Sequence, residues 1–250
     1  MKALVISDIH ANLTALDSVI EDAEIFDMVW CLGDLVGYGP DPNECIERVR
    51  ELPNLTCIIG NHDSAVLDQI DPYVFNSEAR RAIEWTKNTL SPTSLAFLES
   101  LPESMNTRQM LPGISNHVTL VHGSPRQPIW EYLLDTDTAT RNFEFFDTAY
   151  CFVGHTHLPL LFYYRDNNSS ARPLLPETGS QIALSPRAII NPGSVGQPRD
   201  RDSRAAYILY DLDREVIQYR RVAYDIKDVQ KRMRNTGLPE RHIVRLEGGW

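Results

Sequence analysis

The chain has 250 residues, of which 42% are hydrophobic, and its formal net charge is −10 at pH 7. This length and composition allow a substantial buried core, while the acidic charge argues against general binding to the polyanionic backbone of a nucleic acid. No stretch approaches the ~20 apolar residues of a membrane span, and no low-complexity linker divides the chain. We therefore expect one domain over residues 1–250 and no insertion into a membrane.

The cysteines and the N-terminal sequence indicate a cytoplasmic protein. The four cysteines, Cys31, Cys45, Cys57 and Cys151, form no CxxC pair, and three of them lie in apolar strand-like runs. Buried free thiols in a reducing compartment are the ordinary interpretation of that pattern. The apolar run that follows Met1 is too short for a secretory signal.

Short runs rich in Val, Ile, Leu and Tyr predict buried strands through most of the chain. In chain order they are Lys2–Ser7, Met28–Leu32, Thr56–Ile59, Val118–Val121, Tyr150–Val153, Leu158–Tyr164, Ile182–Leu184, Ala188–Ile190, Ala205–Tyr210 and Val216–Val222. Helical patterns separate the first three strands, with apolar faces over Leu13–Ile20 and Asn43–Leu52. Strand–helix–strand alternation indicates parallel strands joined by crossover helices, and hence an α/β fold.

Residues 64–116 differ from this pattern, because two helices are expected there, Ser77–Leu90 and Ser91–Leu101, and no strand. The segment is either a partial helical cap beside a site or ordinary scaffold, and we favour the cap. After residue 150, short turns between the strands suggest antiparallel pairing. A helix over Asp225–Arg234 is expected to close the chain.

Polar residues follow five of the predicted strands, at the point where each strand ends. They are Asp8 and His10, Gly33-Asp34, Gly60-Asn61-His62-Asp63, His122-Gly123 and Gly154-His155-Thr156-His157. In open α/β sheets, ligands bind beyond the carboxyl ends of the strands, so these side chains are expected to meet at one rim. Five of the seven histidines lie here, whereas His117 and His242 are better explained as structural or surface groups.

This combination of side chains is typical of a metal centre. Burying so many polar groups in one place is costly unless something pairs with them. Imidazole suits Zn or Fe, and carboxylate and amide oxygens suit Mn or Mg. Setting His62 aside, seven candidate ligands exceed the four of a single tetrahedral zinc. The set therefore favours two divalent ions that share a bridging carboxylate and lie ~3.5–4 Å apart.

The five blocks, in this order and spacing, resemble those of the calcineurin-like metallophosphoesterase superfamily. The likeness extends over residues 1 to about 200, and Asn191-Pro192-Gly193-Ser194-Val195-Gly196 extends it to the small bacterial phosphodiesterases of that superfamily. The resemblance implies a four-layer αββα sandwich of two mixed β-sheets, which agrees with the predicted strands. It also implies hydrolysis of a phosphate ester.

The resemblance implies a role for each side chain, with two sets of metal ligands that share one carboxylate. The first set is Asp8, His10 and His157, the shared carboxylate is Asp34, and the second set is Asn61, His122 and His155. His62 would bind no metal, but would face the phosphate and protonate the leaving oxygen or stabilise the transition state. Family sites commonly hold Mn, Fe, Zn or Ni, and we take Mn as the first choice. Hydroxide formed from metal-bound water would attack phosphorus.

Three further residues are candidates for contact with the substrate, each with an ordinary structural alternative. Asn12 would touch the phosphate or cap a helix. Arg126 would clamp a phosphate by a bidentate contact or lie on the surface. Trp130 would stack on a nucleobase or pack within the fold. Arg199 and Gln197 come within reach of the rim, but no feature of the sequence assigns them a contact.

The function expected from these features is hydrolysis of a phosphodiester or phosphomonoester of a small metabolite, with a nucleotide or a dinucleoside polyphosphate among the candidates. A protein serine/threonine phosphatase is the alternative within the same chemistry, and a non-catalytic metal-binding scaffold is the alternative of another class. The acidic charge and the lack of a basic groove argue against an exonuclease. The sequence carries no signal for the oligomeric state.

Overall fold

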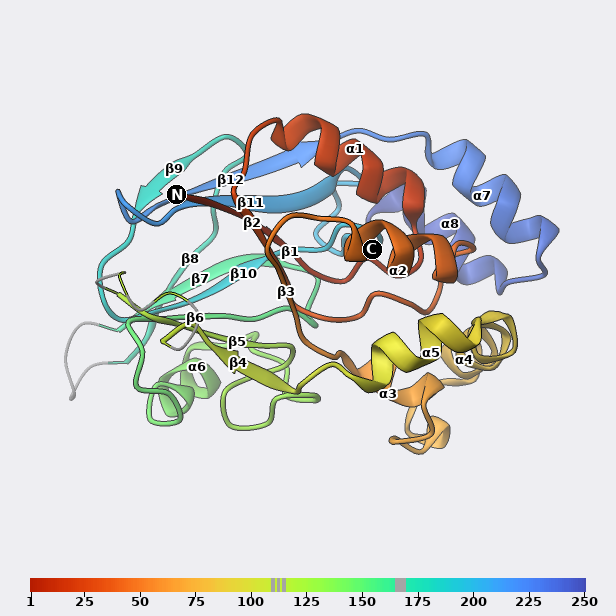
Figure 1. The fold of residues 1–250 in the computed structure, drawn as a ribbon, viewed down its shortest axis with the longest axis horizontal. Helices are drawn as coiled ribbons and strands as arrows, with labels where there is room; N and C mark the ends of the chain where they lie inside the picture. Colours follow the sequence, from red (N-terminus) through yellow and green to blue (C-terminus); the bar gives the residue numbers. More distant parts are fainter. Residues whose placement is uncertain (109–110, 112, 114–115, 165–169) are drawn as a thin grey trace.

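A computed structural model describes residues 1–108, 111, 113, 116–164 and 170–250, and it contains two mixed six-stranded β-sheets (Figure 1). The strands of the first sheet are, in spatial order, β3 (Leu55–Cys57), β2 (Met28–Cys31), β1 (Lys2–Ile6), β11 (Ala205–Asp211), β12 (Val216–Val222) and β9 (Gln181–Ala183). The first three are parallel, as the strand–helix alternation predicted, and the others pair antiparallel.

The second sheet is built from the middle of the chain. Its strands are, in spatial order, β4 (Ser104–Asn106), β5 (Val118–Val121), β6 (Tyr150–Phe152), β10 (Ala188–Pro192), β7 (Pro159–Tyr163) and β8 (Arg172–Leu174). Strands β5, β6 and β10 are parallel, and the outer strands pair antiparallel to them. Each sheet therefore has three adjacent parallel strands, and the carboxyl ends of parallel strands meet at the same edge of a sheet.

Successive side chains along the central strands point to opposite faces of the sheet, and this alternation creates the layers. Ala3 and Val5 of β1 point into the apolar layer between the two sheets, while Leu4 and Ile6 point to the opposite face. That outer face is covered by α1 (Leu13–Ala23) and α2 (Pro42–Arg50), as Figure 1 shows. The outer face of the second sheet carries α6 (Thr136–Asn142), which the sequence analysis did not predict. The result is the expected four-layer αββα sandwich.

Residues 64–116 contain one element that contradicts the sequence analysis. As predicted, two helices lie here, α4 (Ser77–Thr89) and α5 (Pro92–Glu99), preceded by the short α3 (Asn61–Val66) and a 3₁₀ turn at Pro72–Val74. The prediction that the segment holds no strand was wrong, because β4 pairs with β5 at the edge of the second sheet. Three residues, one of them a serine and one an asparagine, are too few to show an apolar period.

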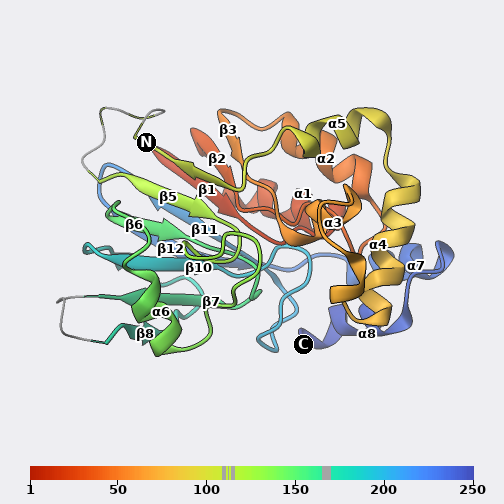
Figure 2. The ribbon, with the colours of Figure 1, turned by 90° about the horizontal axis from the view of Figure 1, so that it is seen from below.

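The C-terminal part also differs from the prediction. The expected helix is present as α7 (Ile226–Asn235), but it does not close the chain, because α8 (Glu240–Gly248) follows it. Helices α4, α7 and α8 lie together beyond one end of the two sheets (Figure 2), and their apolar side chains share a cluster with Tyr38. Among the residues that the structure describes, no helix has the length and apolarity needed to cross a bilayer.

Candidate metal centre and pocket

The ends of the parallel strands bring the predicted ligands together. Two groups of side chains each place their ligand atoms within 4.8 Å of one another, and Asp34 belongs to both groups. The first group is Asp8, His10, Asp34 and His157, and the second is Asp34, His122 and His155. Asp8 and Asp34 follow strands of the first sheet, whereas His122 and His155 follow strands of the second. The site therefore lies where the two sheets meet.

Hydrogen bonds to backbone carbonyls fix the tautomer of three of these histidines. The Nδ1 atoms of His10, His122 and His157 lie 3.1, 2.8 and 2.6 Å from the carbonyl oxygens of Val36, Leu32 and Gln197 respectively. A carbonyl oxygen only accepts a hydrogen bond, so each Nδ1 must donate. In a neutral imidazole the other nitrogen is then an unprotonated acceptor. All three rings thus present a bare Nε2 to the site, which is how metal-binding histidines are oriented.

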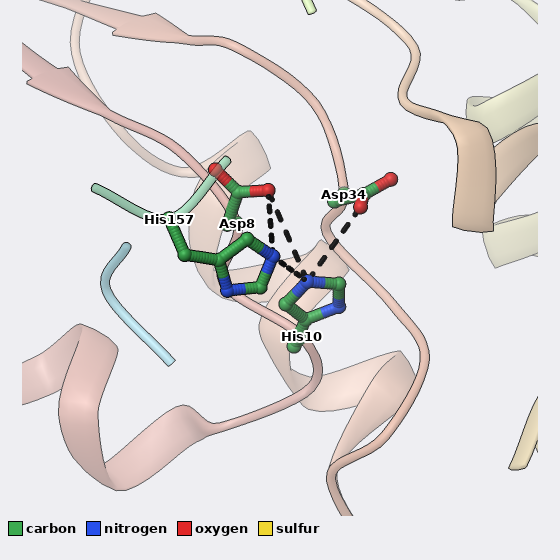
Figure 3. Close-up of side chains that lie close together, drawn as sticks. All are labelled: Asp8, His10, Asp34 and His157. Atoms are coloured by element: carbon green, nitrogen blue, oxygen red, sulfur yellow. Dashed lines mark hydrogen bonds and ion pairs between the residues drawn. The ribbon is translucent and has the colours of Figure 1, made fainter. Parts of the chain in front are cut away.

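The bare nitrogens of the first group face other acceptors. The Nε2 atoms of His10 and His157 lie 3.1 Å apart, and Figure 3 shows both pointing toward the two carboxylates. Asp8 Oδ1 is 3.3 Å from His157 Nε2, and Asp34 Oδ2 is 3.5 Å from His10 Nε2. Neither oxygen has a hydrogen-bond partner among the described residues, although both are buried. Lone pairs that converge without a hydrogen between them repel, and a divalent cation fits between them.

The second group repeats this arrangement on the other side of Asp34. His122 Nε2 lies 3.5 Å from Asp34 Oδ2 and 3.0 Å from Asn61 Oδ1. His155 uses its other nitrogen, because its Nε2 is 3.2 Å from the carbonyl oxygen of Trp130 and must donate to it. That contact leaves Nδ1 of His155 as the acceptor that faces the group.

Burial changes the pKa of the ionisable groups in a direction that suits metal ligands. Burial lowers the pKa of His10, His155 and His157 well below the usual histidine value, so these rings are neutral. Burial raises the pKa of Asp8 to about 7 and that of Asp34 well above its usual value. The two carboxylates are therefore costly to ionise without a cation, and a divalent ion would remove that cost.

The backbone at the site is held in an uncommon conformation. Five residues of the two groups have positive φ without being glycine, with values of 54° at Asp8, 49° at His10, 53° at Asp34, 65° at His155 and 59° at His157. Such residues persist only where the surroundings hold them, and they cluster at functional sites. Hydrogen bonds do so here: the backbone N–H of His10 donates to the Asp34 carbonyl, and that of His155 to Asp8 Oδ2.

The comparisons with known proteins agree with this geometry. The profile of the calcineurin-like phosphoesterase superfamily domain matches residues 1–215. The chain belongs to this superfamily. A metallophosphoesterase from Sphaerobacter thermophilus of known crystal structure is 47% identical and superposes with a TM-score of 0.89, over 100% of this chain and 99% of its own. The protein is accordingly a phosphoric ester hydrolase of a superfamily that uses divalent metal ions.

Two further relatives differ in how much of the chain they match. An uncharacterized protein of Methanocaldococcus jannaschii is 39% identical over 94% of this chain and 93% of its own length. A symmetrical bis(5'-nucleosyl)-tetraphosphatase of Erwinia tasmaniensis is 37% identical over 27% of this chain and 26% of its own length. The similarity to the Sphaerobacter protein covers the whole chain and so includes the C-terminal helices, while that to the tetraphosphatase is confined to about a quarter of each protein.

A pocket of about 300 Å³ opens over the two ligand groups of this phosphoesterase, which together form its metal-type cluster. Its wall includes six predicted site residues, several aromatic side chains and two arginines. The lining residues are Asp34, Tyr38, Asn61, His62, Val74, Phe75, Asn76, Ala79, Trp130, Tyr132, His155, His157, Arg199 and Arg245. Four of them, from Val74 to Ala79, belong to the segment that the sequence analysis favoured as a partial cap.

His62 lies in this pocket among aromatic rings. Its ring centroid is 4.4 Å from that of Tyr38, 5.0 Å from that of Phe75 and 4.9 Å from that of His10. The Nδ1 atom is buried and has no hydrogen-bond partner among the described residues. Burial also lowers the pKa of His62 well below its usual value. The side chain is thus beside the ligand groups without belonging to either of them.

The three predicted substrate contacts have different positions. The Asn12 side chain accepts a hydrogen bond from Ala15 N–H at the start of α1 and donates one to the Gly196 carbonyl, so it caps the helix. Arg126 forms an ion pair with Glu131 and does not line the pocket. Trp130 does line it, with 37% of its surface exposed and its ring 5.2 Å from Phe75.

The arginines of the pocket are ones that the sequence analysis did not assign. Arg199 had been placed only within reach of the rim, and Arg245 had no role. Arg245 lies on α8, a helix that begins after Pro239, is capped by Gly249 and buries His242, Ile243 and Leu246. No short motif links such a distant residue to the strand ends.

Metal affinity should fall as the pH falls, because protons compete with the cation for the same oxygens. With the pKa of Asp8 near 7 in the metal-free protein, binding displaces a proton increasingly below pH 7. Each displaced proton weakens the affinity about tenfold per pH unit. Calorimetric titration of stripped protein with Mn²⁺ at pH 8, 7 and 6 measures this. An affinity that stays constant from pH 8 to 6 would contradict the assignment of Asp8.

Proposed function

We propose that the protein uses two divalent metal ions to hydrolyse a phosphodiester or phosphomonoester of a small metabolite. The observation that carries this proposal is the convergence of bare imidazole nitrogens and unpartnered carboxylate oxygens around Asp34. In the proposal one ion is held by Asp8, His10 and His157, the other by Asn61, His122 and His155, and Asp34 bridges them. Mn is the first choice, with Fe, Zn or Ni as alternatives, since mixed nitrogen and oxygen ligands suit all four.

The residues of the chain have distinct tasks in this mechanism. Two bound ions would supply an activated water and neutralise charge on the phosphate. Asp34 holds the ligand groups at a fixed separation, while the backbone contacts of the histidines keep their free nitrogens aimed inward. His62 lines the pocket beside the ligand groups and protonates the leaving oxygen or stabilises the transition state.

The size and lining of the pocket support a small substrate. A volume of about 300 Å³ lies at the lower end of the range for small-molecule sites. Residues 74–79 form one wall, and we propose that this part of the 64–116 segment acts as a partial cap within a single domain. The adjoining rings of Phe75 and Trp130 offer a surface for a nucleobase. The partial similarity to a bis(5'-nucleosyl)-tetraphosphatase supports nucleotides as candidates.

Two other features concern the setting of the enzyme. The four cysteines are all free and buried, which supports a reducing compartment such as the cytoplasm. The alternatives remain a protein serine/threonine phosphatase, which needs access for a folded substrate, and a non-catalytic scaffold. Retention of His62 beside the ligand groups favours the enzyme over the scaffold, because catalysis needs a histidine that faces the phosphate and metal binding alone does not.

A direct test is hydrolysis by metal-stripped protein refilled with Mn²⁺, Fe²⁺, Ni²⁺, Zn²⁺ or Mg²⁺. The substrates are an aryl phosphomonoester, an aryl phosphodiester, a dinucleoside polyphosphate and a phosphoserine peptide. We expect metal-dependent turnover of at least one small substrate, above that of the peptide. Faster turnover of the peptide would favour the protein phosphatase, and bound metal without any turnover would favour the scaffold.

Replacing His62→Ala should leave metal content unchanged and lower kcat by roughly 10²–10⁴-fold, the usual contribution of a general acid. His117→Ala is the matched control, since His117 lies outside both ligand groups and the pocket. Metal analysis and steady-state kinetics on the same preparations give both values. Loss of metal from His62→Ala protein would contradict the role proposed for this residue.

The substitution Asp34→Asn should weaken the binding of both metal ions, because Asp34 belongs to both ligand groups. His10→Ala and His122→Ala provide the comparison. Each of these histidines belongs to one ligand group, so each substitution should weaken the binding of one ion more than that of the other. Metal content after dialysis against limiting Mn²⁺ measures the occupancy. If Asp34→Asn emptied only one position, Asp34 would not be the bridge.

A further inference from the structure

Two arginines from distant parts of the chain meet at the pocket. Arg199 lies in the loop between β10 and β11, and Arg245 lies on α8, beyond residues 1–215 that match the superfamily profile. Both line the pocket together with Asp34 and His62. The C-terminal helix thus adds a cationic side chain to a site whose other parts come from the superfamily domain.

A single amide holds the two arginines together. The Arg199 Nη2 and Arg245 Nη1 atoms each lie 3.1 Å from Gln197 Oε1, so both guanidinium groups donate to the same oxygen. The backbone carbonyl of Gln197 accepts the Nδ1 hydrogen of His157 at 2.6 Å. The arginine pair is therefore tied through one residue to a histidine of the first ligand group.

The pair lacks the carboxylate partners that neighbouring arginines have. On α7 and α8, Arg232 pairs with Asp41, Arg234 with Glu240, and Arg241 with Glu78. Across the described part of the chain, no carboxylate oxygen lies within 4.0 Å of a nitrogen of Arg199 or Arg245. The Nε atoms of both are buried without a hydrogen-bond partner there.

The electrostatics of the pair favour an anion. The pKa of Arg245 is lowered, first by burial and then by the charge of Arg199. The two cations therefore repel each other at a position that is partly shielded from solvent. Guanidinium groups bind phosphate through paired N–H donors. A phosphate between them would supply acceptors for the unused donors and offset the repulsion.

We propose that Arg199 and Arg245 form a subsite for a second phosphate group, next to the phosphate that is hydrolysed. This proposal rests on the proposed function and narrows the substrate class to organic compounds that carry at least two neighbouring phosphate groups. One phosphate lies at the metal-type cluster, and the next lies between the two guanidinium groups. The Phe75 and Trp130 rings on the wall of the same pocket receive the organic part.

The proposal makes α8 a determinant of specificity. A substrate with a single phosphate contacts the ligand groups and His62 but leaves the arginine pair without an anionic partner. A substrate with a second phosphate gains charge-assisted hydrogen bonds from the two guanidinium groups. The preference for the second phosphate therefore depends on a helix that lies outside the superfamily domain.

Binding of non-hydrolysable probes tests this subsite without relying on turnover. Methylenediphosphonate and methylphosphonate are titrated calorimetrically into full-length Mn²⁺-loaded protein, wild type and variants. We expect wild type to bind the diphosphonate at least about tenfold tighter, and Arg199→Gln and Arg245→Gln each to lose most of that preference. Arg241→Gln is the matched control, because Arg241 is on the same helix, is exposed and pairs with Glu78. It should keep the full preference.

The possible outcomes separate the subsite from the proposed function. Unchanged preference in both arginine variants would overturn the subsite, since the metal ions alone would then account for it. If Arg245→Gln protein fails to fold by circular dichroism, Arg199→Gln and Arg245→Lys decide, and the lysine variant should keep part of the preference. Arginine-dependent preference without turnover of any substrate would support the subsite and contradict the proposed function.

Discussion

The arrangement of the site depends on one electrostatic repulsion. It acts between buried hydrogen-bond acceptors that converge where the strand ends of the two sheets adjoin. His10 Nε2 and His157 Nε2 face each other at 3.1 Å, and carboxylate oxygens of Asp8 and Asp34 lie beside them. Protein groups alone leave this set unbalanced, because each histidine has already used its hydrogen on a backbone carbonyl. Divalent cations would balance it, and the strained backbone of the strand ends keeps the acceptors in place.

Much of the fold and of the cluster could be predicted because the sequence expresses both locally. Buried parallel strands are short continuous apolar runs, and each run is followed at once by the polar residues that it positions, as in Lys2–Ile6 before Asp8. Alternation within β1, with Val5 inward and Ile6 outward, produces the layers without any further signal.

What could not be predicted depends on contacts between distant segments. Strand β4 has three residues and exists because it pairs with β5, and α8 is held by packing against α4 and α7. In the sequence, Arg126 was a candidate phosphate ligand because it closely follows the predicted metal ligand His122. In the structure it forms an ion pair with Glu131 instead. Arg245 shows the opposite case, since its charge lies in the pocket and no carboxylate of the described residues pairs with it. Charge pairing of this kind is visible only in three dimensions.

Anomalous diffraction from crystals grown with Mn²⁺ tests the central claim most directly. The account predicts two anomalous peaks, ~3.5–4 Å apart, with an Asp34 oxygen between them and the free nitrogens of His10, His122 and His157 directed at them. A single peak, or ions bound elsewhere with the acceptors of His10 and His157 still facing each other, would contradict it.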